Sequence, residues 1–184
     1  MKDINELIAK LKMEIAKNDQ ETLFATVIQE IEQFYIDNLG LNPYEVAIFL
    51  TNKEKTILSF ACPEYLVNSG MIPVSSTEAH AATIYRTGRS VTDNKFQQQR
   101  HLGIFEIIRT PEGENLPLFK MMGTPIAVDD DKLGVIEISR RSKREDEAGD
   151  DFTPNNMVFL EKTIKILAPF IKKVMPENFR GKIT

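Results

Sequence analysis

Two short apolar runs in the last third of the chain flank an acidic turn. Thr124–Val128 and Leu133–Ile138 are rich in β-branched residues, and the sequence Asp-Asp-Asp-Lys at 129–132 separates them. Such an arrangement is typical of an antiparallel hairpin. We therefore expect two paired strands here. The acidic residues lack the ligand spacing of a calcium loop, so we expect them to form a solvated turn.

Strand patterns also occur earlier in the chain, beside a short helical pattern. The additional predicted strands are Val46–Thr51, Thr56–Ala61, Met71–Val74 and Arg89–Val91. Between the last two, apolar residues from Ala79 to Tyr85 have helical spacing, and Gly88 suits the end of that helix. Residues 92–117 fit neither a helix nor a strand clearly. Long connections of this kind are frequently binding loops, so we expect this segment to contribute to a site.

Three longer segments have the apolar periodicity of helices. The first carries a narrow stripe of apolar residues from Ile4 to Ile15. The second has Asp19 as its N-cap and a wider apolar stripe, which suits packing on a sheet. The third starts at Thr153 and Pro154. Its apolar residues recur at spacings of three and four, at Met157, Leu160, Ile164, Leu167, Ile171 and Val174. This heptad-like seam, with the N-terminal stripe, predicts a homodimer formed through the terminal helices.

The order of these elements predicts one α+β domain with an antiparallel sheet. We divide the chain into an N-terminal amphipathic helix at 1–18, a domain at 19–175 and a loosely ordered tail at 176–184. The net charge of −4 argues against nonspecific nucleic-acid binding. The apolar runs are shorter than a membrane-spanning helix. We therefore expect neither nucleic acid nor membrane as a partner, and a cytoplasmic location.

Short motifs along residues 21–174 resemble those of GAF domains, in the order found in that family. The matching segments are Ile72-Pro73-Val74 with Thr87-Gly88-Arg89, Val91–Asn94, Met122-Gly123-Thr124-Pro125-Ile126, Leu133-Gly134-Val135-Ile136 and Asp151-Phe152-Thr153. The resemblance implies a PAS-related fold with an antiparallel sheet flanked by the N- and C-terminal helices. Many members of the family dimerise through those helices, and most sense or scaffold while few catalyse.

The resemblance also implies a ligand pocket on the sheet face opposite the terminal helices. Its lining would come from four regions, Ser59–Cys62, Thr77–Thr87, Asn94–Ile108 and Met122–Ile126. Members that bind cyclic nucleotides carry an acidic pair where this chain has Asn156-Met157, which argues against that ligand. Members that bind bilins attach them through a cysteine, but Cys62 precedes Pro63 on a predicted strand. The methionine-sulfoxide-reducing members use several cysteines, whereas this chain has one.

Several side chains in these regions are candidate ligand contacts. They are Cys62, His80, Asn94, Arg100, His101, Phe105, Met122 and Thr124. Arginine suits an anionic group, and amide or hydroxyl groups can orient a small molecule. The two histidines alone are too few ligands for a typical metal site, so we predict no metal site. The sequence identifies no catalytic residue and no cofactor.

Alternative functions therefore stay open at this point. The first is a stand-alone regulatory module that binds a small molecule, a signalling partner or both. The second is a structural adaptor whose pocket is filled by residues 96–108. The third is an enzyme that uses Cys62 or the two histidines, His80 and His101. A single thiol without a neighbouring base, however, is more often a small buried apolar residue.

Overall fold

The structure, a computed structural model, describes residues 2–17, 20–67, 70–96, 107–109 and 114–180. Its centre is an antiparallel sheet with the strand order β3-β2-β1-β7-β6-β4, and β5 pairs with β6 beside this order. The strands are β1 (Val46–Thr51), β2 (Ile57–Cys62), β3 (Met71–Pro73), β4 (Val91–Asp93), β5 (Ile107–Arg109), β6 (Asn115–Val128) and β7 (Asp131–Arg141). The predicted α+β class is confirmed, and β1 has the predicted bounds.

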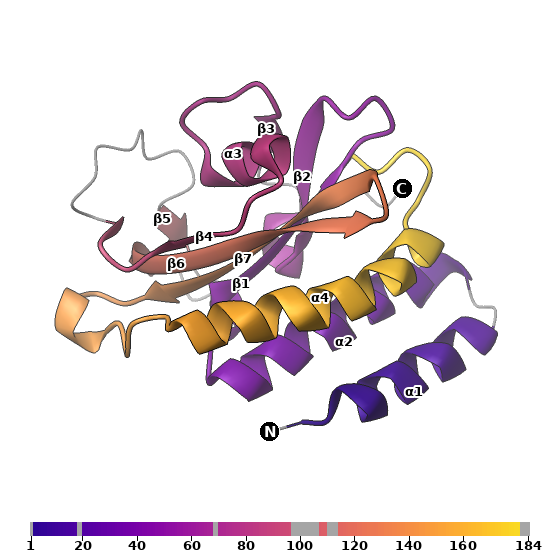
Figure 1. Cartoon of the computed structure of the whole chain (residues 1–184), viewed down its shortest axis with the longest axis horizontal. Helices are drawn as coiled ribbons and strands as arrows, with labels where there is room; N and C mark the ends of the chain where they lie inside the picture. Colours follow the sequence, from indigo (N-terminus) through magenta and orange to yellow (C-terminus); the bar gives the residue numbers. More distant parts are fainter. Residues whose placement is uncertain (1, 18–19, 68–69, 97–106, 110–113, 181–184) are drawn as a thin grey trace.

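Helices cover the two faces of this sheet unequally (Figure 1). The longer helices α1 (Ile4–Ala16), α2 (Gln20–Leu39) and α4 (Pro154–Val174) lie on one face. The short helix α3 (His80–Thr87) lies on the other face. The 3-10 turns η1 (Pro43–Glu45), η2 (Glu64–Leu66) and η4 (Glu145–Glu147) occur in the connections. Among the described residues, no helix combines the length and the apolar composition that crossing a bilayer requires.

Each face of the sheet has its own buried apolar cluster. The helix-side core lies under α1, α2 and α4 and includes Val27, Ile136 and Leu167. The α3-side core includes Phe49 and Ile84. Neighbouring residues of a strand contribute to opposite clusters because successive side chains point to opposite faces.

The predicted hairpin is confirmed, and its strands are longer than the apolar runs that indicated them. β6 and β7 pair from Val128 and Asp131 at the turn to Leu118 and Arg141 at the far end. Close approach of β7 to β1 requires a glycine, because a Cβ at Gly134 would lie 1.9 Å from the backbone oxygen of Phe49.

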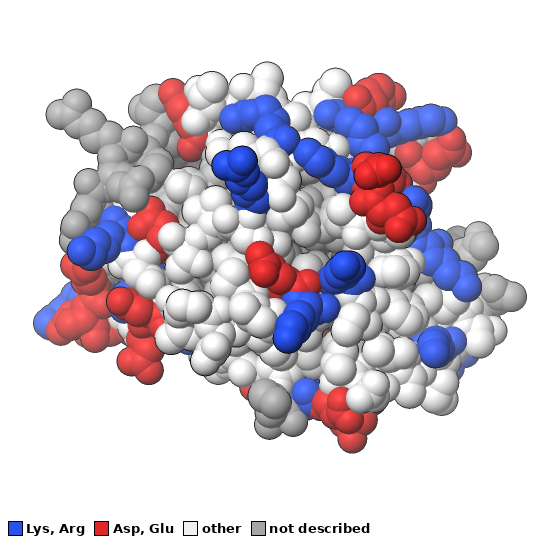
Figure 2. Space-filling view, viewed as in Figure 1, with Lys and Arg blue, Asp and Glu red and all other residues white. Residues whose placement is uncertain are grey.

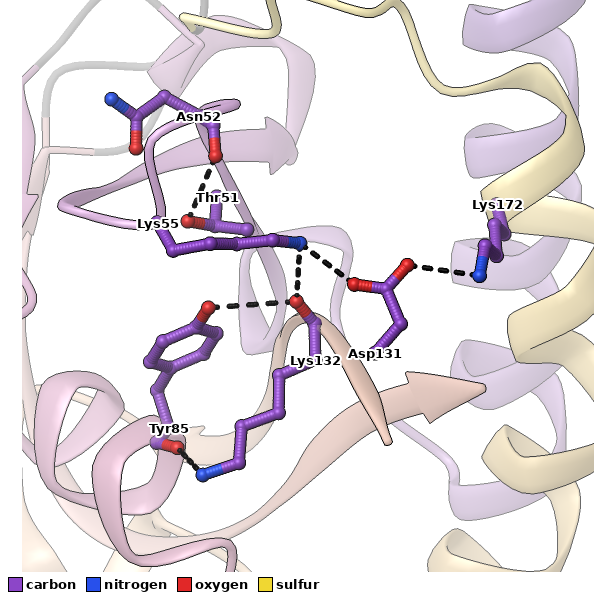
Figure 3. Close-up of polar contacts among 7 residues, drawn as sticks. All are labelled: Thr51, Asn52, Lys55, Tyr85, Asp131, Lys132 and Lys172. Carbon is purple, nitrogen blue, oxygen red and sulfur yellow. Dashed lines mark hydrogen bonds and ion pairs between the residues drawn. The ribbon is translucent and has the colours of Figure 1, made fainter. Parts of the chain in front are cut away.

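The turn of this hairpin connects α4, α3 and the β1–β2 turn (Figure 3). Asp131 pairs with Lys172 of α4 at 2.9 Å and with Lys55 at 3.0 Å, and these lysines hold the pKa of Asp131 below its usual value. Lys132 Nζ donates to the carbonyl oxygen of Tyr85 at 2.9 Å. This oxygen lies at the C-terminal end of α3, where the helix dipole favours a cation. The acidic turn is thus more than the solvated loop predicted, because it helps to fix α3 over the sheet.

The start of α4 is as predicted. Thr153 is the N-cap, and its Oγ1 accepts a hydrogen bond from the backbone N–H of Asn156 at 3.2 Å. Pro154 occupies the first helical position, which needs no N–H donor. The helix continues through Pro169 to Val174.

The apolar seam of α4 is buried in the core of this same chain. Leu160, Leu167 and Ile171 are fully buried. The middle of the predicted seam is therefore covered within this chain, whereas Met157 and Val174 at its ends are half-buried, and the homodimer stays a prediction. Periodicity indicates that a helix face is buried but not which neighbour covers it. The large apolar side chains of α4 that remain exposed are Val158 at 45% and Ile166 at 43%.

Both ends of the chain join the helix-side core. Leu7 and Leu11 of α1 are buried there. Phe179, in the predicted loose tail, is also buried, and its ring centroid lies 5.3 Å from that of Phe24. Packing against the helix-side core therefore continues beyond the predicted boundaries at 18/19 and 175/176, and the division itself stays a prediction.

Candidate functional site

A cavity of about 200 Å³ lies on the α3 face of the sheet, and we call it the α3 cavity. Strands β1, β2, β3, β6 and β7 contribute to it, as do the start of α3 and the segment that precedes it. The lining residues are Tyr44, Ala47, Phe49, Phe60, Met71, Ile72, Pro73, Ser76, Glu78, Ala79, His80, Ala81, Phe96, Leu118, Met121, Glu137, Ser139 and Arg141. Three of the four regions predicted from the family resemblance are represented among them.

Polar side chains of β7 form one side of the α3 cavity. Glu137, Ser139 and Arg141 share a face because they alternate along the strand. Arg141 is buried, its Nε donates to Ser139 Oγ at 3.2 Å, and its Nη1 donates to the carbonyl oxygen of Leu116 at 3.2 Å. Ser139 Oγ donates to the carbonyl oxygen of Glu45 at 3.3 Å. These bonds hold the guanidinium in place beside the cavity.

Glu137 presents an unsatisfied acceptor at this cavity. Its Oε1 is buried and has no hydrogen-bond partner among the described residues. Burial raises the pKa of Glu137 to about 7, against the opposing effect of the positive charge of Arg141. Buried polar atoms in native proteins are nearly always paired, and an exception calls for a specific explanation. Glu137 can exchange a proton near neutral pH and can accept a hydrogen bond from a molecule in the cavity.

Aromatic and aliphatic side chains make up most of the remaining wall. The rings of Phe49 and Phe60 lie 4.4 Å apart between centroids, and the ring of His80 lies 5.1 Å from that of Phe96. Met121 is buried beside them in the α3-side core. A mostly apolar cavity with a few placed polar groups is the usual form of a small-molecule site.

The predicted ligand contacts fall on both faces of the sheet. His80, the first residue of α3, lines the α3 cavity. Cys62 and Met122 belong instead to the helix-side core, and Thr124 alternates with Met122 on the same face of β6. The expected lining by Met122 is therefore corrected to its neighbour Met121, because the strand register places these two residues on opposite faces.

Asn94 has a structural position outside the lining of the cavity. Its Oδ1 accepts from the backbone N–H of Phe152 at 2.9 Å, and its Nδ2 donates to the carbonyl oxygen of the same residue at 3.0 Å. Asn94 thus ties the segment after β4 to the segment before α4. The predicted contacts Arg100, His101 and Phe105 lie outside the described residues.

Sequence reasoning missed the most polar part of the site. Arg140 and Arg141 are not among the predicted ligand contacts, and both lie on β7. Arg140 caps α2 by donating to the carbonyl oxygens of Leu39 and Gly40, at 3.1 and 3.0 Å, and Arg141 lines the cavity. The alternation of Val135, Glu137, Ser139 and Arg141 was the available signal. It was not informative, because polar residues alternating with apolar ones ordinarily face solvent.

Cys62 lacks the features of a reactive thiol. It is buried, and its Sγ is a weak donor to the carbonyl oxygen of Val46 at 3.9 Å. Burial raises the pKa of Cys62 well above its usual value, and the negative charge of Glu32 adds to this effect. A thiol that stays protonated is a poor nucleophile. Within the described part of the chain, no group of three or more His, Cys, Asp and Glu side chains could hold a metal ion.

Comparison with solved structures shows that this chain has the GAF-domain fold. The GAF domain of a phosphoenolpyruvate-protein phosphotransferase from Acinetobacter matches with a TM-score of 0.59 and 12% identity over 94% of this chain and 96% of that one. The GAF domain of a two-component sensor histidine kinase from Bacillus halodurans matches with a TM-score of 0.53 and 18% identity, over 79% and 94% of the two chains.

An enzyme is also among the structural neighbours. A type II free methionine-R-sulfoxide reductase from Thermoplasma acidophilum matches with a TM-score of 0.55 and 10% identity, over 84% of this chain and 96% of that one. By sequence, no family model matches this chain, and no curated protein matches it. These neighbours share the fold, and most of them are domains of sensory or regulatory proteins.

Proposed function

We propose that this chain is a regulatory GAF-fold module that binds a small molecule in the α3 cavity. The observation that carries this proposal is the buried, unpaired Oε1 of Glu137 beside a cavity with mostly apolar walls. A buried acceptor without a partner lowers the stability of the folded chain. In an adaptor whose pocket is filled by its own side chains, no ligand would offset this loss. A ligand that donates a hydrogen bond to Glu137 would remove this cost.

The kinds of neighbour with the same fold support a sensory role. A sensor histidine kinase and a phosphotransferase both contain GAF domains that superpose on most of this chain. The charge distribution also suits a small molecule better than a polyanion, because Lys and Arg side chains lie interspersed with Asp and Glu on the face shown in Figure 2.

The proposed role is binding and not catalysis. One form of the enzyme alternative uses Cys62 as its nucleophile, and the burial and raised pKa of this thiol argue against that chemistry. If a second copy or a signalling protein binds the helical face, the exposed Val158 and Ile166 of α4 are the apolar side chains available to it.

The proposal can be tested by filling the cavity. Ala47 lines it, and Ala47→Leu places additional carbon atoms there. Ala16 is exposed on α1, so Ala16→Leu adds the same atoms at the surface and serves as the control. A set of small aromatic and aliphatic compounds is screened by the shift that each causes in the thermal unfolding temperature. We expect some compounds to stabilise the unaltered chain and the Ala16→Leu variant but not the Ala47→Leu variant. If the stabilising compounds act equally on all three proteins, the cavity is not their site.

A further inference from the structure

Resting on the function proposed above, we infer that the α3 cavity takes a small organic cation, a protonated primary amine on an apolar or aromatic body, with its ammonium group bound to Glu137. The acceptor itself is the first reason. Glu137 Oε1 is buried and unpaired among the described residues, whereas the neighbouring Arg141 and Ser139 have hydrogen-bond partners within the fold. The ionised carboxylate of Glu137 only accepts hydrogen bonds, so its missing partner is a donor, and an ammonium group has three N–H donors and no acceptor. A cation bound there also favours this ionised form over the protonated one.

The charge around the cavity is the second reason. The ionisable side chains that line it are Glu137, Glu78, Arg141, His80 and Tyr44. The lining thus offers two carboxyl groups, of Glu137 and Glu78, against the one guanidinium group of Arg141. A cation at Glu137 would form a charge-assisted hydrogen bond, which is roughly twice as strong as a neutral one. An anionic ligand at the same place would meet a carboxylate and an unpaired acceptor, which is unfavourable.

The walls and the volume are the third reason. Phe49, Phe60 and Phe96 line the same cavity as Glu137, and aromatic faces attract cations when the cation is within reach. A cavity of about 150 Å³ is known to hold benzene. The α3 cavity, at about 200 Å³, therefore has room for one six-membered ring with a short side chain.

The direct test compares ligands that differ only in the group offered to Glu137. Phenethylamine, phenethyl alcohol and phenylacetate are titrated into the purified chain near neutral pH, and affinity is measured by isothermal calorimetry. We expect phenethylamine to bind about tenfold or more tightly than the alcohol, and phenylacetate to bind most weakly. Binding of the alcohol or of phenylacetate with an affinity equal to that of the amine would overturn the inference. This comparison uses the unaltered chain and does not depend on any variant folding.

Paired variants locate the interaction. Glu137→Gln keeps the shape but removes the charge, and we expect it to lower the affinity for phenethylamine about tenfold while leaving the alcohol almost unchanged. Glu145→Gln is the matched control, because Glu145 is exposed on η4 and lies outside the cavity lining. We expect the affinity of this variant for phenethylamine to change by less than about threefold. Equal losses in both variants would contradict a specific role for Glu137.

The amine could be a free amine or part of an amino acid, and phenylalanine distinguishes these sources. If phenylalanine binds as well as phenethylamine, the cavity accepts a carboxylate beside the ammonium group. If only phenethylamine binds, the site takes amines without that group, and both results support a bound ammonium. If phenethylamine does not bind, but neutral compounds bind the unaltered chain and not the Ala47→Leu variant, the amine inference is rejected and the proposed function is retained. Failure of every compound in that screen would reject the proposed function itself.

Discussion

The carboxyl group of Glu137 gives a prediction about how stability depends on pH. Its pKa is raised from the usual 4.5 to about 7 in the folded chain, with burial as the main cause. In the unfolded chain the group returns to its usual value. Between these two values the folded chain holds a proton that the unfolded chain has released. The stabilising contribution is therefore complete below the unfolded pKa of 4.5 and is lost as pH rises through about 7.

The magnitude follows from the size of the shift. Each pKa unit corresponds to about 1.4 kcal/mol, so the full shift corresponds to about 3 kcal/mol in the free energy of unfolding. The residue as a whole is partly exposed although its Oε1 is buried, and screening by water lowers this value. We expect Glu137→Gln to match the unaltered chain in mild acid and to exceed it by about 1–3 kcal/mol near pH 8.

The assay is urea unfolding followed by circular dichroism at a series of pH values. Glu32 provides a comparison, because burial and then the charge of Glu64 raise its pKa to about 7 as well. It lies on α2, on the opposite face of the sheet, so the effects of Glu32→Gln and Glu137→Gln should add. A stability difference between the Glu137→Gln variant and the unaltered chain that stays constant from mild acid to pH 8 would refute the reasoning, because an uncharged perturbation has no pH dependence.

Three further changes test the packing and the helix start, each by urea unfolding. Leu167→Ala should lower the free energy of unfolding by about 2–5 kcal/mol, because Leu167 is fully buried. The control Ile166→Ala, at a 43% exposed position, should lower it by less than about 1 kcal/mol. Equal costs would contradict the assignment of these neighbours to the core and the surface. Gly134→Ala should cost at least about 3 kcal/mol because its Cβ would overlap the backbone oxygen of Phe49, and a variant of unchanged stability would contradict this close approach. Thr153→Ala should cost about 1 kcal/mol through loss of the N-cap, and no change would mean that the cap contributes nothing.

Local signals predicted the elements of this fold well. Val46–Thr51 is a strand with the expected bounds, and Thr153 with Pro154 begins α4 as expected. These features depend on side chains close together in the sequence, such as caps, turns and β-branched runs. The predicted strand at Arg89–Val91 is displaced to Val91–Asp93, where pairing with β6 decides its position.

The faces on which side chains lie were harder to predict. Met121 and Met122 are chemically identical, and the register of β6 alone decides that Met121 lines the cavity. Leu160 and Leu167 have the spacing of a dimer seam, but both are buried in the helix-side core, between α4 and the sheet of the same chain. The alternation of polar and apolar residues along β7 predicts that Glu137 faces solvent. In the fold it lines the α3 cavity, because segments distant in sequence form the other walls of that cavity. Such facts depend on tertiary packing and are not encoded in local spacing.

The central claim, that the α3 cavity is a ligand site, is tested most directly by methyl NMR of the methionines. The chain is labelled with carbon-13 at the methionine methyl groups, and phenethylamine and neutral aromatic compounds are added in turn. The account predicts that a binding compound shifts the signals of Met71 and Met121, which line the cavity, and leaves that of Met122, in the helix-side core, in place. If no compound shifts the Met71 and Met121 signals, or if a binding compound shifts only Met122, the α3 cavity is not the ligand site of this protein.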